Sequence, residues 1–187
     1  MNLNNDPRTS SFLTNVGLIT TNGPYGYNIM ACEWTHQISH DPALIALAIR
    51  NFKATYLNIL QSKEFGVNIA ASNQNVLTSI SGDNTGKKTD KIAALKELGF
   101  EFYKAENIDV LMVHGACMNA ECKLVKHIDI GDHPLLIGEI VSIKSEDKEP
   151  LMYHKSKYWH IGGRIVKPEQ SVLDTIKSVV EKHTKNE

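Results

Sequence analysis

Six consecutive residues, Arg50–Thr55, combine two cations with amide and hydroxyl donors. They follow the apolar run 44–49, which predicts a buried strand, and precede a short helix that we expect over about 54–61. Backbone N–H groups at the start of a helix have no partner within it and attract anions. Arg50, Lys53 and Thr55 would add side-chain donors. The segment could therefore bind a phosphate monoester, and an ordinary solvated helix start fits the same residues.

A second segment, Asn28–Trp34, carries an amide, a thiol and an indole along a stretch that we expect to be extended. A flat aromatic ligand could lie along the edge of such a strand and form hydrogen bonds with its backbone. A core strand with a half-buried tryptophan fits the same pattern. The candidate binding residues in this segment are Asn28, Met30, Ala31, Cys32, Glu33 and Trp34.

Two turn-rich segments offer further polar groups. The glycine- and lysine-bearing loop 81–91 precedes a predicted helix at about 90–98, and Ser81 and Lys88 could contact an anionic ligand. The same loop also fits a mobile surface connection. In the fourth segment, Gly131 and Asp132 predict a turn that would project His133 from a strand end. A turn histidine without any chemical role is the alternative.

The elements that would position these residues are mainly strands. Extended segments are predicted at 16–21, 27–35, 44–49, 65–69, 118–124 and 135–143. Ser72 could cap a helix that carries Val76, Leu77 and Ile80. An amphipathic helix is expected at about 168–184, with proline in its first turn. The pattern predicts an α+β fold that is mainly β, and no dinucleotide or P-loop glycine motif accompanies it.

Composition limits the classes of function. The chain has 187 residues and a net charge of -1, which suit a single domain over 1–187 with its core at about 12–160 and give no case for binding nucleic acid. A polar start and the absence of a long apolar run favour a cytoplasmic protein with no membrane segment. Three cysteines and eight histidines show no metal-ligand spacing, so we expect no metal site. No nucleophile motif occurs.

In this order, the segments resemble the flavin reductase-like family of FMN-binding split barrels, which includes NAD(P)H:flavin oxidoreductases, flavoredoxins and archaeal ferric reductases. The resemblance covers about 16–158. It rests on Asn28–Trp34, Ser39–Pro42, Ala48–Thr55 with Asn58–Ile59, Glu64–Asn68, Glu121–Cys122, Gly131–His133, Gly138–Glu139 and Pro150–Tyr153.

The resemblance implies a six-stranded antiparallel barrel with inserted short helices and a C-terminal helix, assembled as a homodimer. It places the flavin ring along Asn28–Trp34 and the FMN phosphate at Lys53 and Thr55, with further contacts from Arg50, Ser81 and Lys88. His133 would face the nicotinamide of NADH or NADPH. Glu33 departs from the family, which usually has a small residue there.

The implied activity is an NAD(P)H-dependent reductase whose bound FMN passes electrons to free flavin, a metal complex or a partner protein. Two alternatives stay open at this point. One is a flavoredoxin-like carrier that receives its electrons from another protein, and the other is a ligand-storage barrel without turnover.

Overall fold

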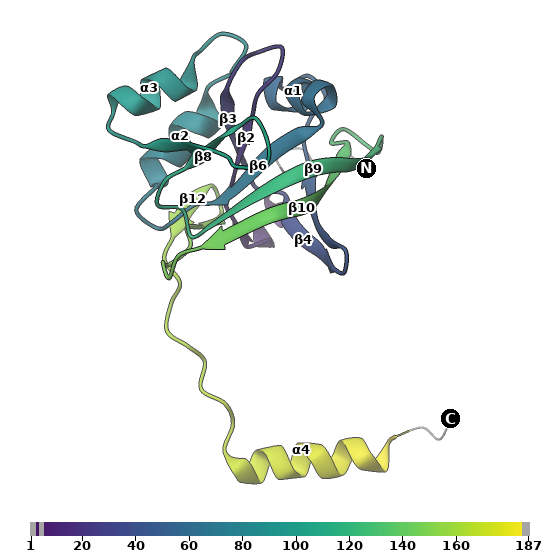
Figure 1. The fold of residues 1–187 in the computed structure, drawn as a ribbon. Helices are drawn as coiled ribbons and strands as arrows, with labels where there is room; N and C mark the ends of the chain where they lie inside the picture. Colours follow the sequence, from purple (N-terminus) through teal and green to yellow (C-terminus); the bar gives the residue numbers. More distant parts are fainter. Residues whose placement is uncertain (1–2, 4–5, 185–187) are drawn as a thin grey trace.

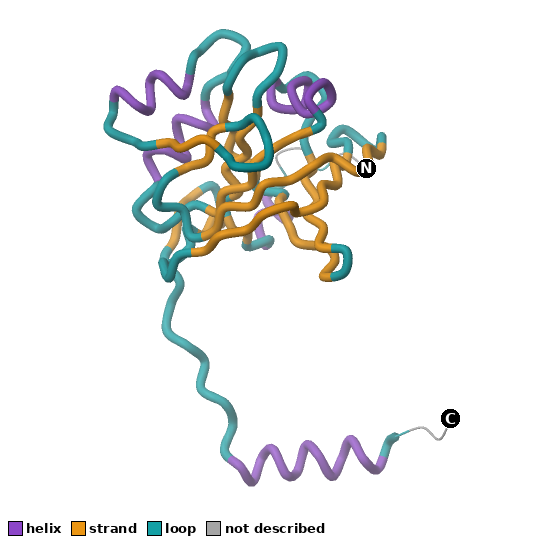
Figure 2. Tube along the Cα trace, viewed as in Figure 1, coloured by secondary structure: helices purple, strands orange, loops and turns teal. Residues whose placement is uncertain are grey.

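The computed structural model describes residues 3 and 6–184. Most of the polar start of the chain, which the sequence suggested carries no signal peptide, lies outside these residues. The described chain forms a curled β-structure flanked by short helices, with one helix held away from it (Figures 1 and 2). None of the helices in this part of the chain is long and apolar enough to cross a lipid bilayer.

A curled antiparallel sheet of seven strands forms the body, in the order β3-β2-β6-β9-β10-β5-β4. The resemblance implied six strands, so this count was wrong. The additional edge strand is the segment after Trp34, which pairs only with β5. The seven strands are β2 (Gly17–Thr21), β3 (Asn28–Cys32), β4 (Thr35–His40), β5 (Ala43–Ala48), β6 (Glu64–Ile69), β9 (Met118–Ile128) and β10 (Leu135–Ser145).

The two edge strands of this sheet, β3 and β4, are neighbours in sequence, and they meet where the sheet curls round. The hydroxyl of Thr35 donates to the carbonyl of Cys32 at 3.0 Å, and the amide of Ala48 donates to the carbonyl of Trp34 at 3.1 Å. The short connection at 33–34 therefore fixes the end of β3 beside the end of β5.

Two smaller sheets flank the body. One contains β1 (Thr14–Asn15), β11 (Met152–His154) and β12 (Lys157–Trp159), and the other is the hairpin of β7 (Phe102–Lys104) and β8 (Leu111–Val113). A short 3-10 helix, Pro7–Ser11, precedes β1. The hairpin covers part of β9, because the buried carboxylate of Glu121 accepts the amides of Glu106 and Asn107 in the hairpin loop.

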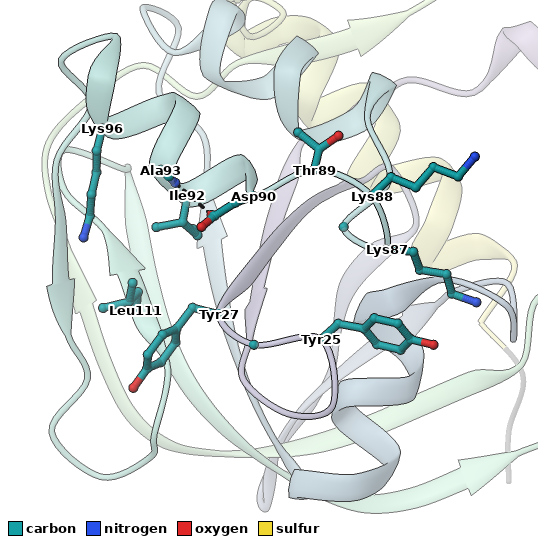
Figure 3. A pocket seen from close by; sticks show the side chains of 12 residues that line it. Tyr25, Tyr27, Lys87, Lys88, Thr89, Asp90, Ile92, Ala93, Lys96 and Leu111 are labelled. Atoms are coloured by element: carbon teal, nitrogen blue, oxygen red, sulfur yellow. Dashed lines mark hydrogen bonds between the residues drawn. The ribbon is translucent and has the colours of Figure 1, made fainter.

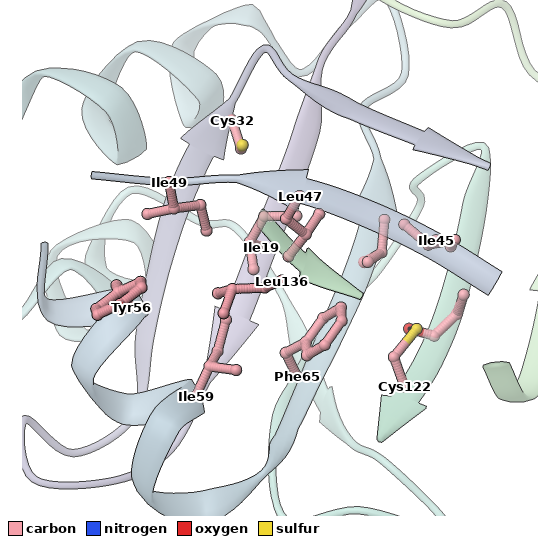
Figure 4. Packing of buried hydrophobic residues seen from close by; sticks show 12 residues of the cluster. Ile19, Cys32, Ile45, Leu47, Ile49, Tyr56, Ile59, Phe65, Cys122 and Leu136 are labelled. Carbon is pink, nitrogen blue, oxygen red and sulfur yellow. The ribbon is translucent and has the colours of Figure 1, made fainter. Parts of the chain in front are cut away.

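The main core fills the interior of the curled sheet (Figure 4). Alternating side chains of the strands point into it, as period-two strand geometry requires. Helix α1 (Ala54–Ser62) closes one side of the core through Tyr56 and Ile59. The buried members of this cluster are Ile19, Cys32, Ile45, Leu47, Ile49, Tyr56, Ile59, Phe65, Val67, Ala120, Cys122 and Leu136.

Helices α2 (Asn75–Asp83) and α3 (Lys91–Glu97) pack beside β3. The expected cap of α2 at Ser72 was wrong, because the helix begins after Gln74 and the Ser72 amide donates to the carbonyl of Glu149 at 2.8 Å. The expected start of the next helix is confirmed: the side chain of Asp90 caps α3 by accepting the amide of Ala93.

The C-terminal helix α4 (Gln170–Lys182) is present within the range expected from its apolar stripe. It lies away from the body at the end of an extended segment, and none of its residues is buried (Figures 1 and 2).

The tightest contact in the core predicts the effect of one substitution. A Cβ at Gly138 would overlap the ring of Phe65, which is fully buried. We expect Gly138→Ala to lower the free energy of unfolding by about 1–3 kcal/mol, as overpacking does. Gly82→Ala is the control, because a Cβ there would lie 3.4 Å from the Cβ of Ala31. Urea unfolding should leave that control at or above the wild-type midpoint, and a wild-type midpoint for Gly138→Ala would contradict this packing.

Candidate functional site

A cavity of about 1110 Å³ opens where the two edges of the curled sheet meet. It is as large as the biggest ordinary small-molecule pockets, which reach roughly 1000 Å³. Eight of the residues proposed from sequence line it: Met30, Ala31, Cys32, Glu33, Trp34, Arg50, Lys53 and His133. Its wall also contains Thr9, Phe12, Thr14, His36, Ala48, Ile49, Gly82 and Asp132. The structure thus brings three sequence-distant segments together.

Strand β3 lines the cavity with Met30, Ala31 and Cys32, and Cys32 also belongs to the buried core. The sulfur of Cys32 lies 3.7 Å from the carbonyl of Trp34 and 3.8 Å from that of Ala48, within the core. Burial raises the pKa of this thiol to about 11, so it is protonated at neutral pH and is no nucleophile. Glu33 follows at the strand end, where partial burial raises the pKa of its carboxyl.

His133 stands at the cavity wall in a fixed orientation and a defined tautomer. Arg50 Nε donates to His133 Nε2 at 3.2 Å, and since that guanidinium nitrogen can only donate, Nε2 carries no proton. The proton is therefore on Nδ1, which lies 2.9 Å from Asp132 Oδ1. This bond is the main reason that the pKa of Asp132 is lowered.

The ring of His133 also contacts Trp34, with 4.6 Å between the ring centroids and 54° between the planes. The turn that carries the histidine forms as the sequence predicted, and Gly131 in it has a φ of 54°. A half-buried imidazole at the start of β10 is thus held next to an indole at the end of β3, on one wall of the cavity.

One end of the cavity collects positive charge at the start of α1. Lys53 lines the cavity and occupies the position before the first helical residue, without capping the helix through its own side chain. The first-turn N–H groups of α1 have no partner within the helix. Thr55 lies in that turn, and its buried hydroxyl accepts the side-chain amide of Asn28 at 2.8 Å. Asn28 and Thr55 thus bond to each other at the start of α1, and neither residue lines the cavity.

A second lysine, Lys91, ends the loop 81–91 that the sequence proposed, but it was not singled out there and does not line the cavity. It is almost fully buried, and its Nζ donates to the carbonyls of Ser81 at 2.9 Å and Asn84 at 3.1 Å. Burial, and then the charge of Lys53, lowers the pKa of Lys91 to about 8. An anion bound near the buried ammonium of Lys91 would stabilise its charged form.

Ser81 and Lys88 are not brought to the cavity. Ser81 is buried within α2, where its hydroxyl donates to the carbonyl of Leu77 at 2.8 Å. Lys88 lines a separate cleft next to Tyr25 and Tyr27. The glycine-rich loop nevertheless contacts Asn28, which bonds Thr55 at the start of α1. The backbone at Gly86 packs so closely on Asn28 that a Cβ on residue 86 would overlap its side chain.

Two cavity residues from the start of the described chain were also missing from the sequence proposals. Thr14 is buried at the cavity wall, and its hydroxyl has no hydrogen-bond partner among residues 3 and 6–184. A buried hydroxyl of this kind is available to a polar atom of a ligand. Phe12 is exposed at the same wall. Only their position in the fold reveals either residue, since neither lies in a recognisable motif.

Comparison with known proteins identifies relatives of this chain. The sequence model described as "Flavin reductase like domain" matches residues 9–162. The reductase component of a flavin-dependent trigonelline monooxygenase from Acinetobacter baylyi is 25% identical over 173 residues, which are 90% of this chain and 50% of that protein. An FMN reductase (NADH) from Agrobacterium fabrum is 22% identical over 143 residues, which are 76% of this chain and 76% of that protein.

A solved structure shares the fold. Flavoredoxin from Methanosarcina acetivorans has a TM-score of 0.76 at 21% identity, covering 87% of this chain and 92% of that chain. The chain spans between 50% and 66% of the length of the first curated relatives that it matches.

The buried lysine predicts a pH dependence of stability. The pKa of Lys91 is near 10.5 in the unfolded chain and about 8 in the folded protein. Between these values the unfolded chain binds more protons, so stability should rise with pH, by up to about 1.4 kcal/mol per pH unit. Lys91→Met should remove this rise, whereas Lys126→Met, at an exposed lysine on β9, should keep it. Urea unfolding from about pH 7 to 10.5 measures the slopes, and equal slopes in wild type and Lys91→Met would refute the burial of this charge.

Proposed function

Because this chain belongs to the flavin reductase-like family, we propose that it binds FMN in the cavity at the sheet junction and acts as an NAD(P)H-dependent reductase. The observation that carries the proposal is the polarity of the cavity. Lys53 at the start of α1 lines this cavity, and so does Trp34, whose ring contacts that of His133. A planar ring system joined to a phosphate monoester could use both the aromatic and the cationic groups.

The residues of the cavity wall and of the start of α1 fit the phosphate and the ring of FMN. Lys53, the first-turn amides of α1 and the charge of Lys91 would hold the phosphate, since ammonium and amide donors bind such oxyanions. The edge of β3 from Met30 to Glu33 would lie along the isoalloxazine ring, with Trp34 at its border. Thr14 offers a buried hydroxyl that lacks a partner in the described chain, and a polar ligand atom would satisfy it.

When bound, FMN supplies the hydride chemistry: it accepts a hydride from a reduced nicotinamide and passes electrons to a second acceptor. The protein's residues bind and orient the reactants. His133 has Nδ1 directed to Asp132 and Nε2 to Arg50, so its ring is held in place and can position a nicotinamide by contact. Glu33 lines the cavity at the edge of the proposed ring site, and partial burial raises the pKa of its carboxyl. This carboxyl would favour some electron acceptors over others.

The acceptor in this proposal is free flavin, a metal complex or a partner protein. A relative that is the reductase component of a monooxygenase supports the last choice. The proposal also includes a homodimer in the cytoplasm. The C-terminal helix supports assembly, because Val172, Ile176, Val179 and Val180 of its apolar stripe are exposed in a single chain and Leu173 is only partly buried.

The function can be tested on the protein loaded with FMN. Stopped-flow mixing with NADH or NADPH should bleach the flavin absorbance of the wild type. We expect His133→Gln to slow this bleaching at least about tenfold, because small displacements of the reacting groups are costly in rate. Its dissociation constant for FMN should stay within about threefold of wild type, since the side-chain hydrogen bonds of His133 go to Arg50 and Asp132 and not to Lys53 or α1.

His114→Gln is the matched control, because that exposed histidine pairs with Glu101 and is not among the cavity residues. It should keep the wild-type rate. If the protein binds FMN but neither NADH nor NADPH bleaches the flavin absorbance, the carrier alternative would replace the reductase proposal. A protein that does not retain FMN would overturn the proposal.

A further inference from the structure

Arg50 is held at the wall of the large cavity, beside the histidine proposed to contact the nicotinamide. It follows Ile49, whose amide donates to the carbonyl of Pro134 at 3.2 Å. This backbone bond fixes Arg50 next to the segment that carries His133. The side chain of Arg50 then contacts the turn before β10 twice: Nε donates to His133 Nε2 at 3.2 Å, and Nη2 lies 3.6 Å from Asp132 Oδ2.

Most of this guanidinium is left without a hydrogen bond. A guanidinium has five N–H donors. Among residues 3 and 6–184, the Nε–H of Arg50 is bonded to His133, and its Nη1 and Nη2 donate no hydrogen bond. The contact from Nη2 is an ion pair with Asp132, whose side chain is 76% exposed, and such exposed pairs contribute little. The donors on Nη1 and Nη2 are therefore available to a ligand in the cavity.

The position of these donors suits an anionic group that is joined to a planar ring. The ring of His133 contacts that of Trp34, and Arg50 is bonded to the same imidazole. In a reduced nicotinamide dinucleotide, a single ribose joins the nicotinamide to the pyrophosphate. The residue that binds the pyrophosphate must therefore lie close to the residue that contacts the nicotinamide. A guanidinium can bind two phosphate oxygens at once through parallel N–H···O bonds.

The lysines nearest to the site have other positions. Lys53 lies at the start of α1, where we place the FMN phosphate. Lys87, Lys88 and Lys96 line a separate cleft that shares no lining residue with the large cavity. Figure 3 shows Lys96 on the opposite side of that cleft from Lys87 and Lys88, so these ammonium groups do not converge on one anion. Within the described chain, the cation bonded to the cavity histidine is Arg50.

We propose that Arg50 binds the pyrophosphate of the nicotinamide dinucleotide that reduces the flavin, and so selects a charged electron donor. The proposal rests on the proposed function, because it needs a flavin in the cavity and a nicotinamide against His133. The chain has a net charge of -1, so its overall field does not attract an anionic donor and a local cation has to do so. The resemblance gave Arg50 to FMN, whereas its side-chain contacts go to the turn before β10 and not to α1.

Two electron donors with the same dihydronicotinamide ring test the proposal. NADH carries the pyrophosphate, and N-benzyldihydronicotinamide does not. Stopped-flow reduction of the FMN-loaded protein gives a half-saturating concentration for each donor. We expect Arg50→Gln to raise this concentration at least about tenfold for NADH, because charge-assisted hydrogen bonds are lost. For the benzyl donor it should stay within about threefold of wild type.

Arg164→Gln is the matched control, because it removes the same charge from an exposed arginine that does not line the cavity. It should behave as wild type with both donors. Arg50→Lys keeps the positive charge but lacks the forked donors, so it should raise the half-saturating NADH concentration less than Arg50→Gln does. Added salt should weaken the saturation by NADH more in wild type than in Arg50→Gln, since salt screens charge.

Equal increases for the two donors in Arg50→Gln would overturn the proposal and leave Arg50 as a support for His133. Unchanged saturation by NADH would also overturn it. So would a loss of FMN affinity of more than about threefold, which would assign the guanidinium to the FMN phosphate. Failure of the proposed function looks different: the flavin of the wild-type protein is then bleached by neither donor, and this proposal falls with it.

Discussion

The arrangement of the site depends on the closure of the curled sheet at Cys32–Thr35. A sheet edge exposes unpaired backbone groups, and here the two edge strands are joined by only two residues, so both edges lie at the same place. The bonds from Thr35 to Cys32 and from Ala48 to Trp34 hold this junction. The free edge of β3, the end of β5 and the turn before β10 consequently surround one cavity.

A second constraint is the burial of Lys91. A buried ammonium is costly unless it is hydrogen-bonded, and the carbonyls of Ser81 and Asn84 supply those bonds. They tie the end of α2 to the start of α3 and hold the intervening loop against Asn28. An anion at the start of α1 would relieve the remaining charge repulsion with Lys53. The same residues thus organise the loop and favour a phosphate.

Much of this organisation follows from local patterns in the sequence. Alternating and apolar runs predicted β2, β5, β6, β9 and β10, and the turn before His133 was recognisable from its glycine and aspartate. Local patterns could not place Trp34 against His133, because that contact joins residues 99 positions apart through the sheet closure.

The incorrect or missing predictions have the same origin. The backbone amide of Ser72 donates to the carbonyl of Glu149, a residue distant in the sequence. Ser72 therefore pairs with another segment of the chain and does not cap the helix. Lys91 resembled a surface lysine in a polar loop, and only the packing of α2 and α3 shows that it is buried. The separate strand β4 arises because the chain bends at 33–34, which a continuous extended pattern from 27 to 35 does not reveal.

The central claim is that the lysine end of the cavity binds the phosphate of FMN. The most direct test compares the affinities of the wild-type protein for FMN and for riboflavin, which has the same ring and lacks the phosphate. Charge-assisted hydrogen bonds contribute about 1.5–3 kcal/mol each, and about 1.4 kcal/mol is tenfold in affinity. With at least two such bonds, FMN should bind at least about a hundredfold more tightly than riboflavin. Equal dissociation constants for the two flavins would contradict the account.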